Sequence, residues 1–209
     1  MNNYHLNRRK FLKNSTNLFA LTAFAPHALE HLFTDKVWKV GLIGSGWYGK
    51  SDLFRLIQVA QVDVVAICDV DSQMLDEAAT LVSKRQKSGK VPLKYSDYRI
   101  MLKEHAFDIV LIGSPDHWHA LQAIEAIKAG AHVFLQKPIS VDVVEGEAIL
   151  AAARKYNKVV QIGTQRRSTP HLVKAKSEII DSGMLGKVSY VDMCCYYHMR
   201  GNITSDPQP

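Results

Sequence analysis

The sequence has 209 residues, of which 47% are hydrophobic and 22% are charged, as in globular rather than disordered proteins. The formal net charge is +6, but four of the basic residues lie among the first thirteen, and the remainder shows no basic stripe interleaved with aromatic residues. This pattern argues against nucleic-acid binding. The three cysteines, Cys68, Cys194 and Cys195, form neither a disulfide framework nor a zinc pattern.

Residues 1–35 are predicted to be an export signal and a linker. The stretch NRRKFLK, residues 7–13, resembles the twin-arginine export signal. The apolar stretch that follows, residues 18–25, is too short and too polar for a stable membrane span. We therefore expect a periplasmic protein; the alternative is a cytoplasmic protein with a basic amphipathic start.

The sequence HALEH, residues 27–31, matches the histidine spacing of one class of zinc peptidases. On a helix, His27 and His31 would share one face. A catalytic zinc site also requires a packed helix and a third ligand. Since this segment precedes the first predicted strand, we predict no metal site.

From residue 37 onward, short apolar runs alternate with helical patterns. The apolar runs are nearly continuous in Val, Ile and Leu, as in strands that are covered on both faces. These predicted strands lie within residues 37–44, 61–71, 107–116, 131–138 and 158–164. Helices are predicted within residues 51–60, 72–86, 95–105, 119–130 and 141–156. The alternation predicts an α/β fold with a doubly wound parallel sheet, a Rossmann domain, over residues 36–165.

A glycine-rich turn follows the first predicted strand. Gly44, Gly46 and Gly49 have the spacing G-x-G-x-x-G, at a point where a strand gives way to a helix. In dinucleotide-binding folds the first glycine permits the tight turn, the second lets the backbone approach a pyrophosphate, and the third allows close packing of helix and strand. The helix N-terminus would present free N–H groups to the phosphates. Trp47 and Tyr48 fall within the motif and are expected beside the cofactor.

An acidic residue follows the second predicted strand. Asp69 lies 25 positions after Gly44, where a carboxylate is expected to bind the adenosine ribose hydroxyls. The same carboxylate would repel a 2′-phosphate, so NAD is favoured as the cofactor over NADP. NADP stays possible, because the loop after Asp71 could hold a phosphate.

The stretches GLIGSGWYG, CDVD, GSPDHWHA, QKPIS and GTQRRS resemble, in order and spacing, those of the Gfo/Idh/MocA oxidoreductases. The resemblance covers residues 37 to about 197. It implies a nicotinamide cofactor on the Rossmann domain and hydride transfer to or from a hydroxyl of a sugar or polyol. It also implies a second domain with an open sheet, which covers the substrate and mediates homo-oligomers.

The resemblance assigns a catalytic role to Lys137, which would reach the nicotinamide and the substrate hydroxyl. A cation there can stabilise a developing alkoxide or relay its proton. The family carries Glu-Lys-Pro at this strand end, whereas Gln136 precedes the lysine here. An amide can hydrogen-bond to an ammonium but cannot pair with its charge. The alternative is a solvated lysine at a strand end.

The remaining site residues also come from the resemblance. Ser114 and Pro115 match the loop over the cofactor, with His119 near the site. Gln165 would point toward the nicotinamide or substrate. The neighbouring arginines, Arg166 and Arg167, would either do the same or form inter-domain salt bridges.

A helix at 171–183 and a strand at 186–199 would begin the second domain, a truncated α+β domain over residues 166–209. The resemblance places the general base, usually a histidine with a nearby aspartate, beyond this stretch; His198 is only a weak candidate. Three functions therefore remain open: an NAD(P)-dependent oxidoreductase, an NAD-dependent redox-assisted glycoside hydrolase, and a cofactor-binding protein without turnover.

Overall fold

The computed structural model describes residues 36–194. The predicted export signal, the HALEH sequence and His198 lie outside these residues. No helix in the described part of the chain has the length and apolar character needed to cross a membrane.

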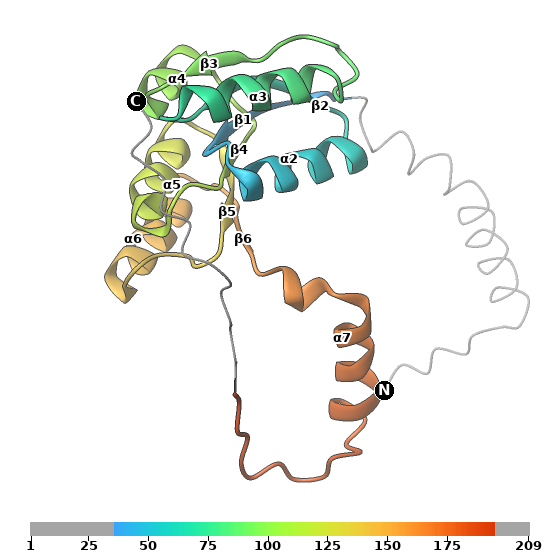
Figure 1. The fold of residues 1–209 in the computed structure, drawn as a ribbon. Coiled ribbons are helices and arrows are strands. Elements are labelled where there is room, and N and C mark those ends of the chain that lie inside the picture. Colours follow the sequence, from blue (N-terminus) through green and yellow to red (C-terminus); the bar gives the residue numbers. More distant parts are fainter. Residues whose placement is uncertain (1–35, 195–209) are drawn as a thin grey trace, which may run out of the picture. The chain divides into compact units, whose positions relative to one another are not determined.

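A six-stranded, all-parallel sheet forms the centre of the domain (Figure 1). Its strands are β1 (Trp38–Ile43), β2 (Val62–Cys68), β3 (Leu93–Tyr95), β4 (Ile109–Ile112), β5 (His132–Gln136) and β6 (Val160–Gly163). Five of them confirm the predicted strands. The sixth, β3, was not predicted, because it has only three residues and Leu93 is half exposed, so no apolar run marks it.

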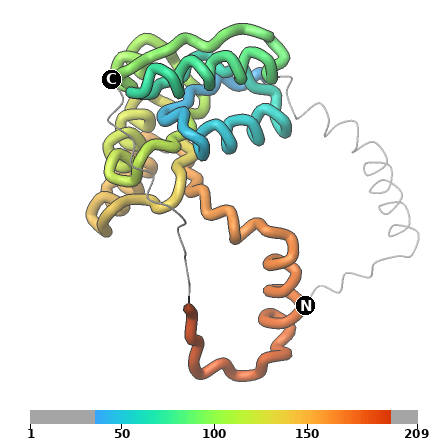
Figure 2. Tube along the Cα trace, viewed as in Figure 1, coloured from blue at the N-terminus to red at the C-terminus, as the bar shows by residue number. Residues whose placement is uncertain are grey.

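The strand order is β3-β2-β1-β4-β5-β6. The chain builds β1 to β3 in one direction and then returns past β1 to build β4 to β6 in the other, as the change from blue and green to yellow shows in Figure 2. The direction of winding therefore reverses between β1 and β4. In open parallel sheets, ligands bind at this switch point, outside the carboxyl ends of the strands.

Helices cover both faces of the sheet, which confirms the doubly wound arrangement (Figure 1). One face is covered by α2 (Trp47–Val59) and α3 (Ser72–Ser83). The other face is covered by α4 (Tyr98–Glu104), α5 (His119–Lys128) and α6 (Val143–Lys155). A short 3-10 turn, Asp116–Trp118, precedes α5.

The central strands are apolar along their whole length because both of their faces are buried. On one face, Val40 and Leu42 of β1 pack in a cluster with Leu53 of α2. On the other face, Ile112 of β4 lies in a cluster with Ile127 of α5. All five side chains are at most 1% exposed. Replacing one such leucine by alanine typically costs about 2–5 kcal/mol of stability.

After β6 the chain forms a 3-10 turn, Gln165–Ser168, and then α7 (Pro170–Ala175), which continues into a π-helix, Lys176–Ile180. These elements confirm a helix in the stretch predicted at 171–183. The strand predicted from residue 186 is wrong for its described part, since residues 186–194 contain no strand. A strand needs a neighbour for its backbone hydrogen bonds, and no described residues pair with this stretch.

Candidate functional site

The predicted site residues gather at one edge of the sheet because each follows the carboxyl end of a parallel strand. The glycine turn follows β1, Asp69 follows β2, and Ser114 follows β4. Gln136 ends β5, and Gln165 follows β6. Parallel strands end at the same edge, so residues far apart in the sequence are brought together there.

The three glycines of the turn are required for different reasons. Gly44 has φ +86°, and a Cβ there would come within 2.5 Å of the Ser114 backbone nitrogen. A Cβ on Gly49 would collide with the carbonyl oxygen of Gly44, so this glycine lets α2 lie against β1. A Cβ on Gly46 would meet nothing within 4 Å. The backbone at Gly46 therefore faces open space, which fits the close approach of a ligand.

The N-terminus of α2 carries no side-chain cap. Gly46 is its N-cap residue, and no acidic residue lies in its first turn. In contrast, Asp71, Asp97 and Asp142 cap α3, α4 and α6 through side-chain bonds to backbone N–H groups. The first N–H groups of a helix lack intrahelical partners, and the dipole makes this end positive. The start of α2 is thus suited to bind an anionic group such as a diphosphate.

Asp69 is joined to the glycine turn by hydrogen bonds. Its Oδ2 accepts from the backbone N–H of Ser45 at 2.5 Å and from the Ser45 hydroxyl at 2.9 Å. Its Oδ1 accepts from the Asp71 N–H at 3.0 Å. Oδ2 therefore already accepts two bonds, whereas Oδ1 accepts one and can accept a further bond, so the position remains compatible with a ribose hydroxyl.

The surroundings of Asp69 favour NAD over NADP. Residues 70–73, which follow it, contain no lysine or arginine to bind a 2′-phosphate. Arg99 lies near the same pocket, but Asp97 holds its guanidinium in a bidentate pair, with both N–O distances at 2.9 Å. An arginine in such a pair has fewer donors free for a phosphate.

A pocket of about 370 Å³ joins the loops after β1, β2 and β4. It brings together five predicted residues: Gly44, Gly46, Asp69, Ser114 and Pro115. Sequence reasoning did not predict its other walls, which include Val70, Ser96, Tyr98, Trp118 and Gln122. The mixture of apolar and aromatic walls with a few polar groups is typical of a small-molecule site.

A second group of predicted residues meets at the ends of β5 and β6. Gln136 is buried, and its Oε1 accepts from the Lys137 backbone N–H at 2.8 Å and from Gln165 Nε2 at 3.2 Å. The Lys137 Nζ lies 5.8 Å from the centre of the Tyr48 ring, which comes from the first turn of α2. The Lys137 ammonium therefore lies beside the N-terminus of α2, which follows the glycine turn. Trp47 makes an edge-on contact with Tyr48 but is 76% exposed.

His119 is 1% exposed and joins two loops of the site. Its Nδ1 lies 2.6 Å from the carbonyl oxygen of Pro138, and its Nε2 lies 3.0 Å from that of Ser114. The ring nitrogen that carries the hydrogen can donate to one of these carbonyl oxygens, and the ring lies against both loops, which favours a role in holding them. Cofactor contact by His119 stays a prediction.

Asp52 is a site residue that sequence reasoning missed. Its Oδ2 accepts from Gln136 Nε2 at 2.6 Å, across 84 positions of sequence. Burial raises the pKa of Asp52, and the hydrogen bond from Gln136 partly opposes this shift. Nothing in the helical pattern of residues 51–60 distinguishes this acid from a solvated one, so no sequence signal could have identified it.

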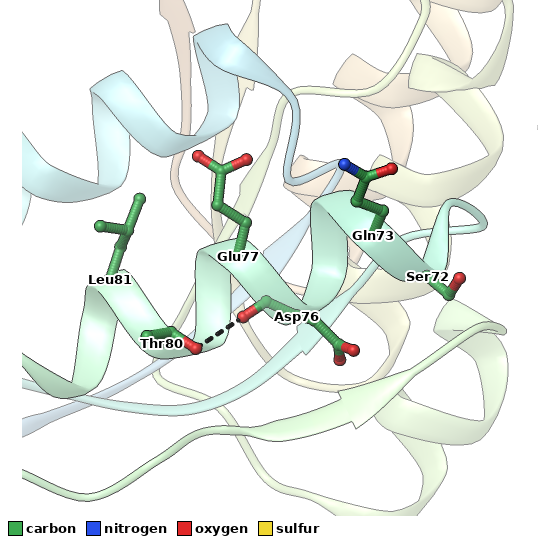
Figure 3. Close-up of a pocket in the computed structure, with 6 residues that line it drawn as sticks. All are labelled: Ser72, Gln73, Asp76, Glu77, Thr80 and Leu81. Atoms are coloured by element: carbon green, nitrogen blue, oxygen red, sulfur yellow. Dashed lines mark hydrogen bonds between the residues drawn. The ribbon is translucent and has the colours of Figure 1, made fainter.

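A hollow of about 580 Å³ along α3 contains none of the predicted site residues (Figure 3). Two of its carboxylates are paired outside it: Asp76 with Lys94 at 2.6 Å and Glu77 with Lys50 at 2.8 Å. We therefore assign no function to it. Among residues 36–194, no three potential metal ligands form a cluster. No described contact decides between the alternatives for Arg166 and Arg167.

Comparison with known proteins agrees with this geometry. An inositol 2-dehydrogenase of Salmonella paratyphi B is 32% identical over 151 residues, which are 71% of this chain and 43% of that protein. A glycosyl hydrolase family 109 protein of Shewanella sp. (strain W3-18-1) is 32% identical over 124 residues, 58% of this chain and 27% of that protein. The chain thus spans less than half the length of these relatives.

Among solved structures, scyllo-inositol dehydrogenase from Lactobacillus casei, with bound NAD(H) and scyllo-inositol, superposes with a TM-score of 0.62. It is 29% identical, and the match covers 72% of this chain and 43% of that one. Residues 38–164 match the model of the Gfo/Idh/MocA oxidoreductase family, specifically its NAD-binding Rossmann fold. The chain therefore belongs to the Gfo/Idh/MocA family of oxidoreductases, and its parallel sheet is the NAD-binding Rossmann domain of that family.

Proposed function

We propose that the protein is an NAD-dependent oxidoreductase that transfers hydride between the nicotinamide and a hydroxyl of a polyol or sugar. One observation carries this proposal: the uncapped start of α2 and the Lys137 ammonium lie together at the carboxyl edge of the sheet. The N-terminus of α2 can bind the diphosphate of a dinucleotide. The lysine ammonium beside it can stabilise a substrate oxygen that gains negative charge during the reaction.

The bound cofactor would supply the hydride acceptor or donor, and the residues of this chain would hold it in place. The open backbone at Gly46 and the first N–H groups of α2 would bind the diphosphate. Asp69 would bind the ribose hydroxyls. Lys137 would bind the substrate hydroxyl and stabilise the alkoxide that forms as the hydroxyl proton passes to water.

Polyols are the proposed substrate class because two of the similar proteins are inositol dehydrogenases. Similarity to a family 109 glycosyl hydrolase favours a second candidate, redox-assisted glycoside cleavage. In that reaction the sugar is oxidised transiently, the aglycone is eliminated, and NAD is regenerated. Net NADH formation distinguishes the first reaction from the second.

The test uses the full 209-residue chain. Calorimetry measures NAD binding, and NADH absorbance follows turnover with myo-inositol, scyllo-inositol and a panel of sugars, while nitrophenyl glycosides test the second reaction. The K137M variant should lose at least about 100-fold in turnover, since a removed charge-stabilising group typically costs this much. The K155M variant is the matched control, because Lys155 also lies over a tyrosine ring, at 5.6 Å, but belongs to α6. NAD binding without turnover of any compound would support a cofactor-binding protein and contradict the enzyme proposal.

We also propose twin-arginine export to the periplasm, on the basis of the sequence NRRKFLK at residues 7–13. Such export carries folded proteins, so the cofactor would be bound before transport. Replacing both arginines by lysine should retain the protein in the cytoplasm, as cell fractionation would show. Homo-oligomers are proposed from the family resemblance, and light scattering of the purified chain tests them.

A further inference from the structure

The side-chain amide of Gln136 has only one orientation that satisfies its neighbours. The backbone N–H of Lys137 can only donate, so the atom of Gln136 that lies 2.8 Å from it must be the oxygen. The same oxygen accepts from Gln165 Nε2 at 3.2 Å. The Gln136 nitrogen must therefore face Asp52, whose Oδ2 lies 2.6 Å away.

Asp52 and Tyr48 lie one turn apart on α2, so they share a face of the helix. Tyr48 faces the Lys137 ammonium, with the ring centre 5.8 Å from Nζ. Asp52 reaches the backbone of the same lysine through the Gln136 amide. The segment that carries Lys137 is thus held against α2 at two points.

We infer that Asp52 is a positioning residue for Lys137: its carboxylate fixes the Gln136 amide, and this amide holds the Lys137 backbone N–H. The role given to Lys137 rests on the proposed function. The contact also explains why an amide stands at position 136. A glutamate there would put two carboxylates within 2.6 Å of each other, where both cannot stay ionised.

A charge swap tests the pair. The Q136E variant should lower Tm at neutral pH by about 5 °C, because one of the two contacting carboxyl groups must stay protonated well above its ordinary pKa. In the double variant D52N/Q136E, the amide introduced at position 52 can donate to the carboxylate introduced at position 136, and Tm should return to within about 2 °C of the wild type. The matched control is Q161E, at an exposed glutamine of the neighbouring strand, which should leave Tm unchanged.

Hydrogen exchange tests whether Asp52 acts on Lys137. In D52A the Gln136 amide loses its partner, and the Lys137 N–H should exchange at least about tenfold faster, while the Leu135 N–H of β5 changes little. In D52N an oxygen acceptor remains, and the exchange rate should stay near that of the wild type.

An unchanged Lys137 rate in D52A, or a double variant no more stable than Q136E, would overturn the inference. If D52A does not fold, the swap decides alone. Neither readout needs cofactor or substrate, so a lack of turnover in all variants would refute only the proposed function.

Discussion

Alanine substitutions at Gly46 and Gly49 should differ in their effects on cofactor binding and on stability. A methyl group at Gly46 would meet open space, whereas one at Gly49 would collide with the backbone. In the G46A variant the backbone angles, φ −62° and ψ −174°, are allowed for alanine. Reduced freedom of the unfolded chain should stabilise the variant by about 0.4–1 kcal/mol. Alanine is a poorer N-cap than glycine, which costs a similar amount. We therefore expect Tm to change by less than about 3 °C.

NAD binding by G46A should weaken substantially despite the unchanged fold. The new methyl group would occupy the space through which a diphosphate approaches the N–H groups of α2. Losing one hydrogen bond to a charged group costs about 1.5–3 kcal/mol. Such a loss corresponds to a rise of about 10- to 150-fold in Kd. Calorimetric titration of NAD into both proteins, with a thermal melt of each, measures the two effects.

The G49A variant is the control with the opposite behaviour. Its Cβ would collide with the carbonyl oxygen of Gly44, so α2 must move away from β1. Such overpacking typically costs about 1–3 kcal/mol, and Tm should fall by about 5 °C or more. If G46A instead bound NAD as tightly as the wild type, the diphosphate would not lie against this turn, and the assignment of the site would be refuted.

Three further predictions concern single residues. Because the pKa of Asp52 is raised, the folded state binds the proton of this carboxyl group more tightly than the unfolded state does. The free energy of unfolding should therefore fall as pH rises from the ordinary pKa of 3.8 through the raised pKa. The D52N variant should not show this fall, as thermal melts across the acidic pH range would reveal. D69A should raise the Kd for NAD about tenfold or more, and it should reduce the ratio of the Kd for NADP to the Kd for NAD, as titration of both cofactors measures. H119A should lower the free energy of unfolding by ~2 kcal/mol in denaturant titrations, since the carbonyl oxygen that accepts from the ring N–H, that of Ser114 or of Pro138, loses its buried donor. The role given to Asp52 would be contradicted if D52N kept the pH profile of the wild type. The role given to Asp69 would be contradicted by an unchanged cofactor preference in D69A, and the role given to His119 by an unchanged unfolding midpoint in H119A.

Sequence reasoning predicted the parts of the fold that local patterns determine. The strands β1, β4 and β5 are rich in apolar residues, and the glycine spacing after β1 favours a tight turn into a helix. It also predicted that the residues after the strands share one edge, since parallel strands must end together. The doubly wound architecture follows from these two kinds of information.

The features that were missed depend on contacts between distant residues. The strand β3 has no apolar run of its own and is defined by its pairing with Ala66, Ile67 and Cys68 of β2. The bond between Asp52 and Gln136 forms only when α2 and β5 come together in the fold. A strand was predicted from residue 186 as the start of the second domain that the resemblance implies, but strand formation requires a partner strand, and no described residues pair with this stretch.

The most direct measurement is a crystal structure of the 209-residue protein with NAD. We predict that the diphosphate accepts hydrogen bonds from the backbone N–H groups at the start of α2, close to Gly46, and that the Lys137 ammonium faces the nicotinamide ring. A cofactor bound elsewhere, or a lysine turned away from the ring, would contradict the account.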